Sequence, residues 1–193
     1  DLTVFLEGPT VVNTMRTDLR TADVLPTNDP YELGGVAANA MMQRTGSSKP
    51  VDWVIVQLRS AANTTSVIDE IPAMLLADGR VVLASGKAPL VFSDAPRGDY
   101  HVAVLHRNHL GAMTFAPQTL GTGVKKLNMS DPAVVMYGTD ARKVIGSISA
   151  LWAGDGNADG AILYTGAAND RDLILFNIGG TVPTNTVLGY YDE

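Results

Sequence analysis

The 193-residue sequence contains no cysteine, which excludes disulfide bonds, cysteine-based zinc sites and a thiol nucleophile. Aromatic residues make up only 6% of the chain, a small share for a protein that binds glycans strongly. No uninterrupted apolar run approaches the ~20 residues that a membrane-spanning helix needs, so we expect no membrane span. Hydrophobic residues nevertheless make up 46% of the chain, which excludes wholesale disorder and allows an ordinary buried core.

Basic residues are also few. The chain has 14 Lys and Arg against 20 Asp and Glu, and the longest basic cluster is the pair Lys125-Lys126. Because a nucleic-acid backbone is bound by clustered basic side chains, we expect no nucleic-acid partner. Residues 1–6 lack the basic region and the cleavage site of an intact signal peptide, although a trimmed chain of this kind is compatible with secretion.

Short apolar segments rich in β-branched residues alternate with frequent Gly and Pro turn signals, a pattern typical of antiparallel β proteins. Asp78-Gly79 between two such segments predicts a tight hairpin, because Gly accepts the positive φ that the turn requires. Residues 7–50 carry many turn signals and predict a long surface excursion with a short helix near residues 14–21. We therefore expect an all-β fold, an Ig-like antiparallel β-sandwich over residues 1–140. The predicted strands cover residues 2–6, 51–59, 74–77, 81–85, 89–92, 100–106, 112–115 and 118–127.

An acidic loop near the C-terminus matches the first eight positions of the EF-hand calcium-loop pattern. Oxygen-bearing side chains at alternate positions of a tight loop converge on one hard cation. Gly160 at the sixth position permits the sharp turn, and Ala161 at the seventh offers its backbone carbonyl. The same residues also fit a polar turn that bonds its own backbone, but three clustered carboxylates repel one another without a cation, which favours Ca2+. The matched residues are Asp155-Gly156-Asn157-Ala158-Asp159-Gly160-Ala161-Ile162.

The sequence identifies the ligand that closes the calcium loop less directly. An ordinary loop has a bidentate carboxylate at position twelve, where this chain has Gly166. Asn169 is a good N-cap for the apolar segment that follows, and Asp172 then stands three residues on, in the capping-box position. If Asn169 is taken as the ninth position of the loop pattern, Asp172 becomes the twelfth, which is the closing ligand. The loop then carries an insertion over about residues 163–168, and Asp170 is the alternative closing ligand. The predicted metal ligands are Asp155, Asn157, Asp159, Ala161 and Asp172 or Asp170.

The segment from Trp152 to Gly160, followed by the segment from Tyr164 to Asp172, resembles the dockerin-like calcium segment of a family of β-sandwich modules. These modules occur in large secreted bacterial surface proteins of the hemagglutinin-like and type IX-secreted kinds. Leu6-Glu7-Gly8-Pro9 and the runs 51–59, 98–111 and 114–117 extend the resemblance over most of the chain. The resemblance implies a calcium-binding loop-helix tail over residues 141–193, packed on the sandwich, and a secreted or cell-surface location.

The expected function is that of a non-catalytic structural or adhesion module, whose partners are calcium and neighbouring domains of a larger surface protein or like subunits. No Gly-x-Ser-x-Gly elbow is present, and sequence alone pairs no two carboxylates at a glycosidase separation, so we expect no enzyme. Strand alternation places His101 and His106 on opposite faces, so the three histidines are not expected to converge on a metal. Two alternatives stay open: a carbohydrate-binding module with structural calcium that takes glycans, and a self-assembling filament or surface-layer subunit.

Overall fold

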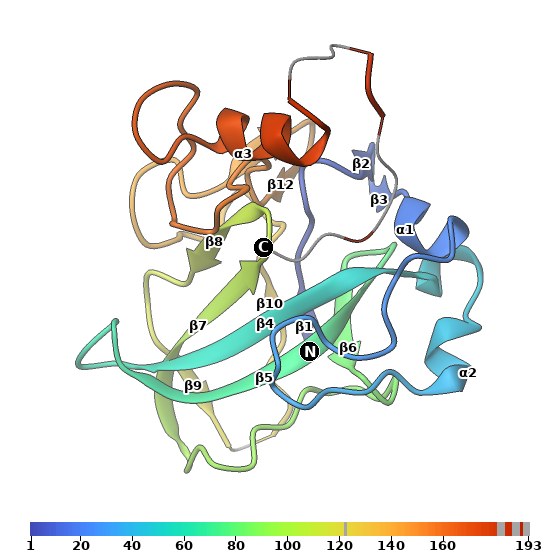
Figure 1. Cartoon of the computed structure of the whole chain (residues 1–193). Helices are drawn as coiled ribbons and strands as arrows, with labels where there is room; N and C mark the ends of the chain where they lie inside the picture. The colour runs from blue at the N-terminus through green and yellow to red at the C-terminus, as the bar shows by residue number, and fades with distance from the viewer. Residues whose placement is uncertain (122, 181–183, 187–189, 191–193) are drawn as a thin grey trace.

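A computed structural model of the chain describes residues 1–121, 123–180, 184–186 and 190. Most of its regular structure is β, as the sequence predicts, and the largest element is one curled mixed sheet (Figure 1). Two long antiparallel strands, β4 (Pro50–Ser60) and β5 (Val67–Leu76), form the middle of this sheet. In the part of the chain that the structure describes, no helix is long and apolar enough to cross a membrane.

The other strands extend the sheet on both sides of β4 and β5. The order is β10-β1-β6-β5-β4-β7-β8, and β9 also pairs with β7. Pairing is antiparallel except between β1 and β10, which run parallel. The strands are β1 (Leu2–Thr3), β6 (Arg80–Leu83), β7 (Gly98–His106), β8 (His109–Met113), β9 (Gln118–Leu120) and β10 (Leu127–Asn128).

Small elements surround the sheet. Two short hairpins are β2 (Thr10–Val11) with β3 (Thr14–Met15), and β11 (Lys143–Ile145) with β12 (Ile148–Ala150). The helices are α1 (Asp18–Thr21), α2 (Asn39–Met42), the 3-10 turn η1 (Gly46–Ser48) and α3 (Asp170–Asn177).

Strand β4 buries both of its faces, which explains its nearly continuous apolar sequence. Val54, Val56 and Leu58 point into the main core, as the predicted alternation requires. Trp53 points the other way and is fully buried with Met41 in a second cluster that the 7–50 excursion covers. Residues 7–50 therefore cover a second core and are not only a surface loop.

Two local predictions are confirmed and two are wrong. The hairpin between β5 and β6 turns at Gly79, whose φ is 84°, and a short helix, α1, lies within residues 14–21. Residues 89–92 form no strand, because the Asp69 carboxylate accepts the backbone N–H groups of Asp94 and Ala95 and holds this segment as a loop. The strand predicted over 118–127 is split, since β9 and β10 pair with different neighbours.

The hairpin β11–β12 packs with the sheet. Ala150 and Leu151 are fully buried in the main core, and Leu151 forms a parallel bridge with Leu6. The predicted domain boundary at residue 140 therefore falls just before a hairpin that shares the core of the preceding residues. The far end of the predicted tail, which includes 181–183, 187–189 and 191–193, lies outside the described residues.

Candidate functional site

The loop from Asp155 to Ala161 is wound by side-chain to backbone hydrogen bonds. The Asp155 carboxylate accepts the Gly160 N–H at 3.2 Å. Asn157 Oδ1 accepts the Asp159 N–H at 3.0 Å, and Asp159 Oδ1 accepts the Ala161 N–H at 2.9 Å. Gly160 has a φ of 82°, a conformation that glycine adopts without strain. The alternate oxygen-bearing residues singled out in the sequence thus belong to one tightly turned loop.

Asp170, the first residue of α3, fastens this helix to the loop. Its carboxylate accepts the N–H of Gly156 at 2.8 Å and the N–H of Leu163 at 2.7 Å. Burial by itself raises the pKa of Asp170, but the N–H groups of Leu163, Gly156 and Asn157 outweigh it and hold the pKa below its ordinary value. Asp170 is therefore an ionised group inside the loop-helix segment.

The Asp172 carboxylate has different partners from the Asp170 carboxylate. Asn169 caps α3 by accepting the Asp172 N–H at 3.0 Å, as its sequence position predicts, and its own amide donates to the Asp172 carboxylate at 2.8 Å. Arg171 pairs with the same carboxylate at 2.8 Å, and the Asp172 side chain is 59% exposed. Within the described residues, these contacts keep Asp172 with the first turn of α3, whereas Asp170 contacts the loop directly.

Asp155 is buried with incomplete hydrogen bonding among the described residues. It is 3% exposed, and its Oδ1 has no hydrogen-bond partner among the residues that the structure describes. Burial raises the pKa of Asp155, and the negative charges of Asp170 and Asp159 raise it further. A buried carboxylate with an unpaired oxygen and two acidic neighbours is short of positive charge.

The described residues contain no group of three or more His, Cys, Asp or Glu side chains that is arranged to hold a metal ion. The ligand set expected here depends partly on other oxygens, those of Asn157 and of the Ala161 carbonyl. One Asp159 carboxylate oxygen also accepts a hydrogen bond from the Asn157 side-chain amide at 3.0 Å. A cation at this loop would replace that hydrogen bond as the partner of the carboxylate.

A second polar cluster, which sequence reasoning missed, surrounds Asp52 at the start of β4. Its carboxylate accepts hydrogen bonds from His106 Nε2 and Arg107 Nη2, both at 3.2 Å, and from the Tyr190 hydroxyl at 3.0 Å. The Trp53 N–H adds a fourth at 2.8 Å. Burial by itself raises the pKa of Asp52, but the bonds and charges of His106 and Arg107 hold it below its ordinary value.

His109 extends this cluster toward the N-terminal segment. Its Nδ1 lies 3.0 Å from His106 Nδ1 and 2.7 Å from Asn108 Oδ1, while Gly8 donates its N–H to Nε2. Burial, and next the neighbouring His106, lower the pKa of His109 to about 2, so its ring is neutral. His101 instead contacts the Thr114 carbonyl at 2.9 Å.

The Asp52 cluster is closed to solvent, with Asp52, His106 and His109 all buried. It joins β4, the turn between β7 and β8, the N-terminal segment and Tyr190, which suits it to holding the fold together. The sequence signal that could have revealed this cluster is Asp52, a charged residue at the start of an otherwise apolar strand, because a buried carboxylate requires partners. The identity of those partners depends on the pairing of β4 with β7, which a single sequence does not show.

Comparisons of this chain with protein-family models, with curated proteins and with solved structures found no match in any of the three.

Proposed function

We propose that this chain is a non-catalytic, calcium-binding structural or adhesion module of a secreted bacterial surface protein. The observation that carries the proposal concerns Asp155, which is buried beside the acidic residues Asp159 and Asp170 and whose Oδ1 has no hydrogen-bond partner among the described residues. Oxygen atoms so placed are the ligands that a hard divalent cation prefers. A bound calcium ion supplies the positive charge that the loop lacks, so its binding free energy adds to the stability of the loop-helix segment.

The contacts favour Asp170 over Asp172 as the closing carboxylate. Asp170 already reaches across to Gly156 and Leu163, whereas Asp172 is held by Asn169 and Arg171. The proposed set is therefore Asp155, Asn157, Asp159, the carbonyl of Ala161 and Asp170. In this set Asp172 keeps the role of completing the cap of α3.

A surface next to this loop supports the role of a module that packs against another domain. Ile162, Leu163 and Tyr164 follow the calcium-loop residues, and Ile174 and Phe176 lie on α3; all five side chains are exposed, Phe176 by 80%. Exposed apolar side chains gathered on one short segment are typical of protein contact surfaces. Calcium would then order the segment that meets a neighbouring domain or a like subunit.

We also retain the Ig-like β-sandwich as the interpretation of the curled sheet. It is supported by the antiparallel pairing that runs from β6 to β8 and by the burial of both faces of β4. The parallel pair of β1 and β10 departs from a simple antiparallel sandwich.

Thermal unfolding of metal-stripped protein, titrated separately with calcium and with magnesium, tests the calcium proposal. We expect calcium, and not magnesium, to raise Tm in the unaltered protein and in Asp172→Asn. The rise should disappear in Asp155→Asn and Asp170→Asn, which remove a ligand charge at nearly constant shape. No calcium-dependent rise in the unaltered protein would overturn the proposal, and a rise lost only in Asp172→Asn would overturn the choice of Asp170.

A further inference from the structure

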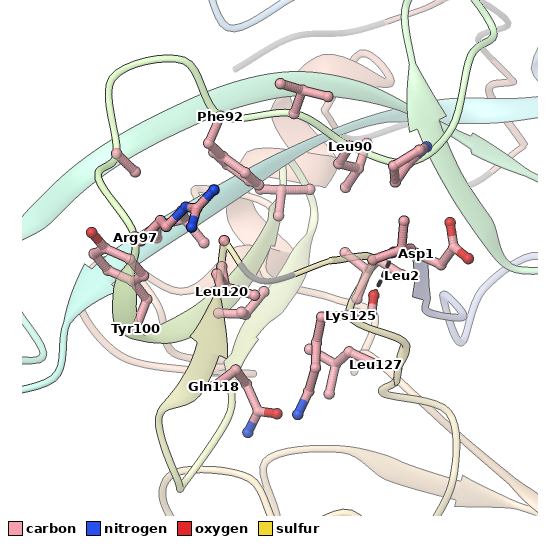
Figure 2. Close-up of a pocket in the computed structure, with 18 of the residues that line it drawn as sticks. Asp1, Leu2, Leu90, Phe92, Arg97, Tyr100, Gln118, Leu120, Lys125 and Leu127 are labelled. Carbon is pink, nitrogen blue, oxygen red and sulfur yellow. Dashed lines mark hydrogen bonds between the residues drawn. The ribbon is translucent and has the colours of Figure 1, made fainter.

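An apolar cavity of about 330 Å³ lies on the main-core face of the sheet, well away in sequence from the acidic loop (Figure 2). Its floor is made by buried residues of the central strands, among them Val56 and Leu58 of β4 and Val102 of β7. Leu90 and Phe92 of the 89–97 loop cover it from the other side. Ligand sites in proteins begin at about this volume and are lined mainly by apolar side chains.

The loop over the cavity is held in place by its own contacts. The Tyr100 hydroxyl donates to the Pro96 carbonyl at 2.6 Å, and the Asp69 carboxylate accepts the N–H groups of Asp94 and Ala95. The roof is thus tied to both β7 and β5. A cavity with a fixed roof is formed before any ligand arrives, which lowers the ordering cost of binding.

The polar groups on the cavity wall are biased toward positive charge. Arg97, Lys125 and Gln118 contribute to the lining, together with one acidic side chain, that of Asp1. In the view of Figure 2 the Arg97 guanidinium lies beside Phe92 and Tyr100. Neither the Arg97 side chain nor the Lys125 side chain has an ion pair or hydrogen bond with another residue that the structure describes.

We propose that this cavity binds a small anionic amphiphile. Its apolar chain or ring occupies the space over Val56 and Leu58, and its carboxylate or similar acidic head lies at Arg97. The volume suits a single medium-length chain or one ring system and not a lipid with two long chains. A guanidinium donates two parallel hydrogen bonds to a carboxylate, which gives the head-group preference.

Competition with a fluorescent probe tests this proposal. The probe is 1-anilinonaphthalene-8-sulfonate, an aromatic sulfonate whose emission rises in apolar sites. Decanoate, decanol and decyltrimethylammonium, all kept below micelle formation, then compete for it. We expect decanoate to displace the probe at least tenfold more effectively than decyltrimethylammonium, with decanol between them. Equal competition by all three, or no probe binding to the folded protein, would overturn the proposal.

Two variants locate the site. Arg97→Gln, at an exposed position, should weaken decanoate about tenfold and leave decanol unchanged. Leu90→Trp should fill the cavity and weaken all three competitors, whereas Val144→Trp, exposed on β11 away from the lining, should weaken none. If Leu90→Trp fails to fold, Arg97→Gln decides. An Arg97→Gln variant that binds decanoate as the unaltered protein does would refute the assignment of the head group.

Discussion

Two aspartates in this protein have the same small exposed fraction and opposite surroundings. Asp52 and Asp155 are each 3% exposed. Asp52 receives four hydrogen bonds, two of them from His106 and Arg107, and its pKa is lowered. One oxygen of Asp155 has no partner among the described residues, its neighbours Asp159 and Asp170 are acidic, and its pKa is raised.

The contrast shows that burial alone does not decide what a carboxylate does. The free energy of a buried charge depends on the donors and charges that meet it. The protein supplies those partners to Asp52 from its own chain, so that site stabilises the fold. At Asp155 the chain supplies oxygens and acidic groups instead, which is the environment where we propose that calcium binds.

The largest expected effect is the difference in the free energy of unfolding between the same substitution made at Asp52 and at Asp155. Asp52→Asn removes the charge that compensates Arg107 and His106, and breaking a buried pair of this kind costs about 3 kcal/mol in the free energy of unfolding. Asp155→Asn in calcium-free buffer relieves repulsion, so its free energy of unfolding should stay within about 0.5 kcal/mol of the unaltered value or rise. Urea denaturation measures both. Equal losses of unfolding free energy in the two variants would contradict the proposed difference between the two sites.

The next effect concerns pH and the Asp52 cluster. The pKa of His109 is lowered to about 2 in the fold, so below its ordinary value of 6.5 the unfolded chain binds a proton that the folded protein does not. Stability is therefore complete above pH 6.5 and falls as pH decreases, by about 2 kcal/mol between pH 6.5 and pH 5. His109→Gln should flatten this part of the profile, measured by urea denaturation at each pH. A profile with the same slope in the variant would contradict the assignment to His109.

The third prediction tests the difference between the two aspartates through the stability that calcium adds. Calcium at ten times its Kd should add about 1.4 kcal/mol to the free energy of unfolding. The increment should survive in Asp52→Asn, which weakens the sheet, and vanish in Asp155→Asn. Unfolding followed with and without calcium gives the increment directly. Its loss in Asp52→Asn would mean that the two buried sites are coupled.

The smallest effect tests whether α3 presents Asp170 to the loop. Asn169→Ala removes the N-cap and should weaken this helix by about 1 kcal/mol. Calcium affinity should fall with it, because Asp170 is held at the loop by the first turn of α3. Calorimetric titration with calcium measures the affinity, and Asp172→Asn, which leaves the Asn169 side chain in place, is the control. An unchanged affinity in Asn169→Ala would place the closing ligand elsewhere.

The features that the sequence predicted well are local. The alternation in β4, the turn at Gly79 and the cap at Asn169 each depend on residues within a few positions of one another. The features that it missed are contacts between distant segments. Asp52 meets His106 only because β4 pairs with β7, and residues 89–92 remain a loop because Asp69, on β5, takes their neighbours' N–H groups. Neither contact leaves a periodic pattern in the chain.

The same distinction applies at the acidic loop. The spacing of Asp155, Asn157 and Asp159 identified the loop, since these residues follow the 1, 3, 5 pattern of a calcium ligand set. The choice between Asp170 and Asp172 depended on which carboxylate faces the loop, and adjacent capping residues look equivalent in a sequence. The structure separates them by their partners, Gly156 and Leu163 against Arg171.

The position of β1 has a consequence for how the chain folds. This short strand lies between β6 and β10, and Leu6 just after it bridges to Leu151. On one side its partner is β10, so Leu2 pairs with Leu127, far along the sequence. Strand β1 acquires both neighbours only once β6 and the distant β10 are in place, and folds closed by such distant pairings form slowly. Until residues 127–151 are available, the apolar residues 2–6 lack their partners on one side, and this unpaired edge is open to wrong pairing.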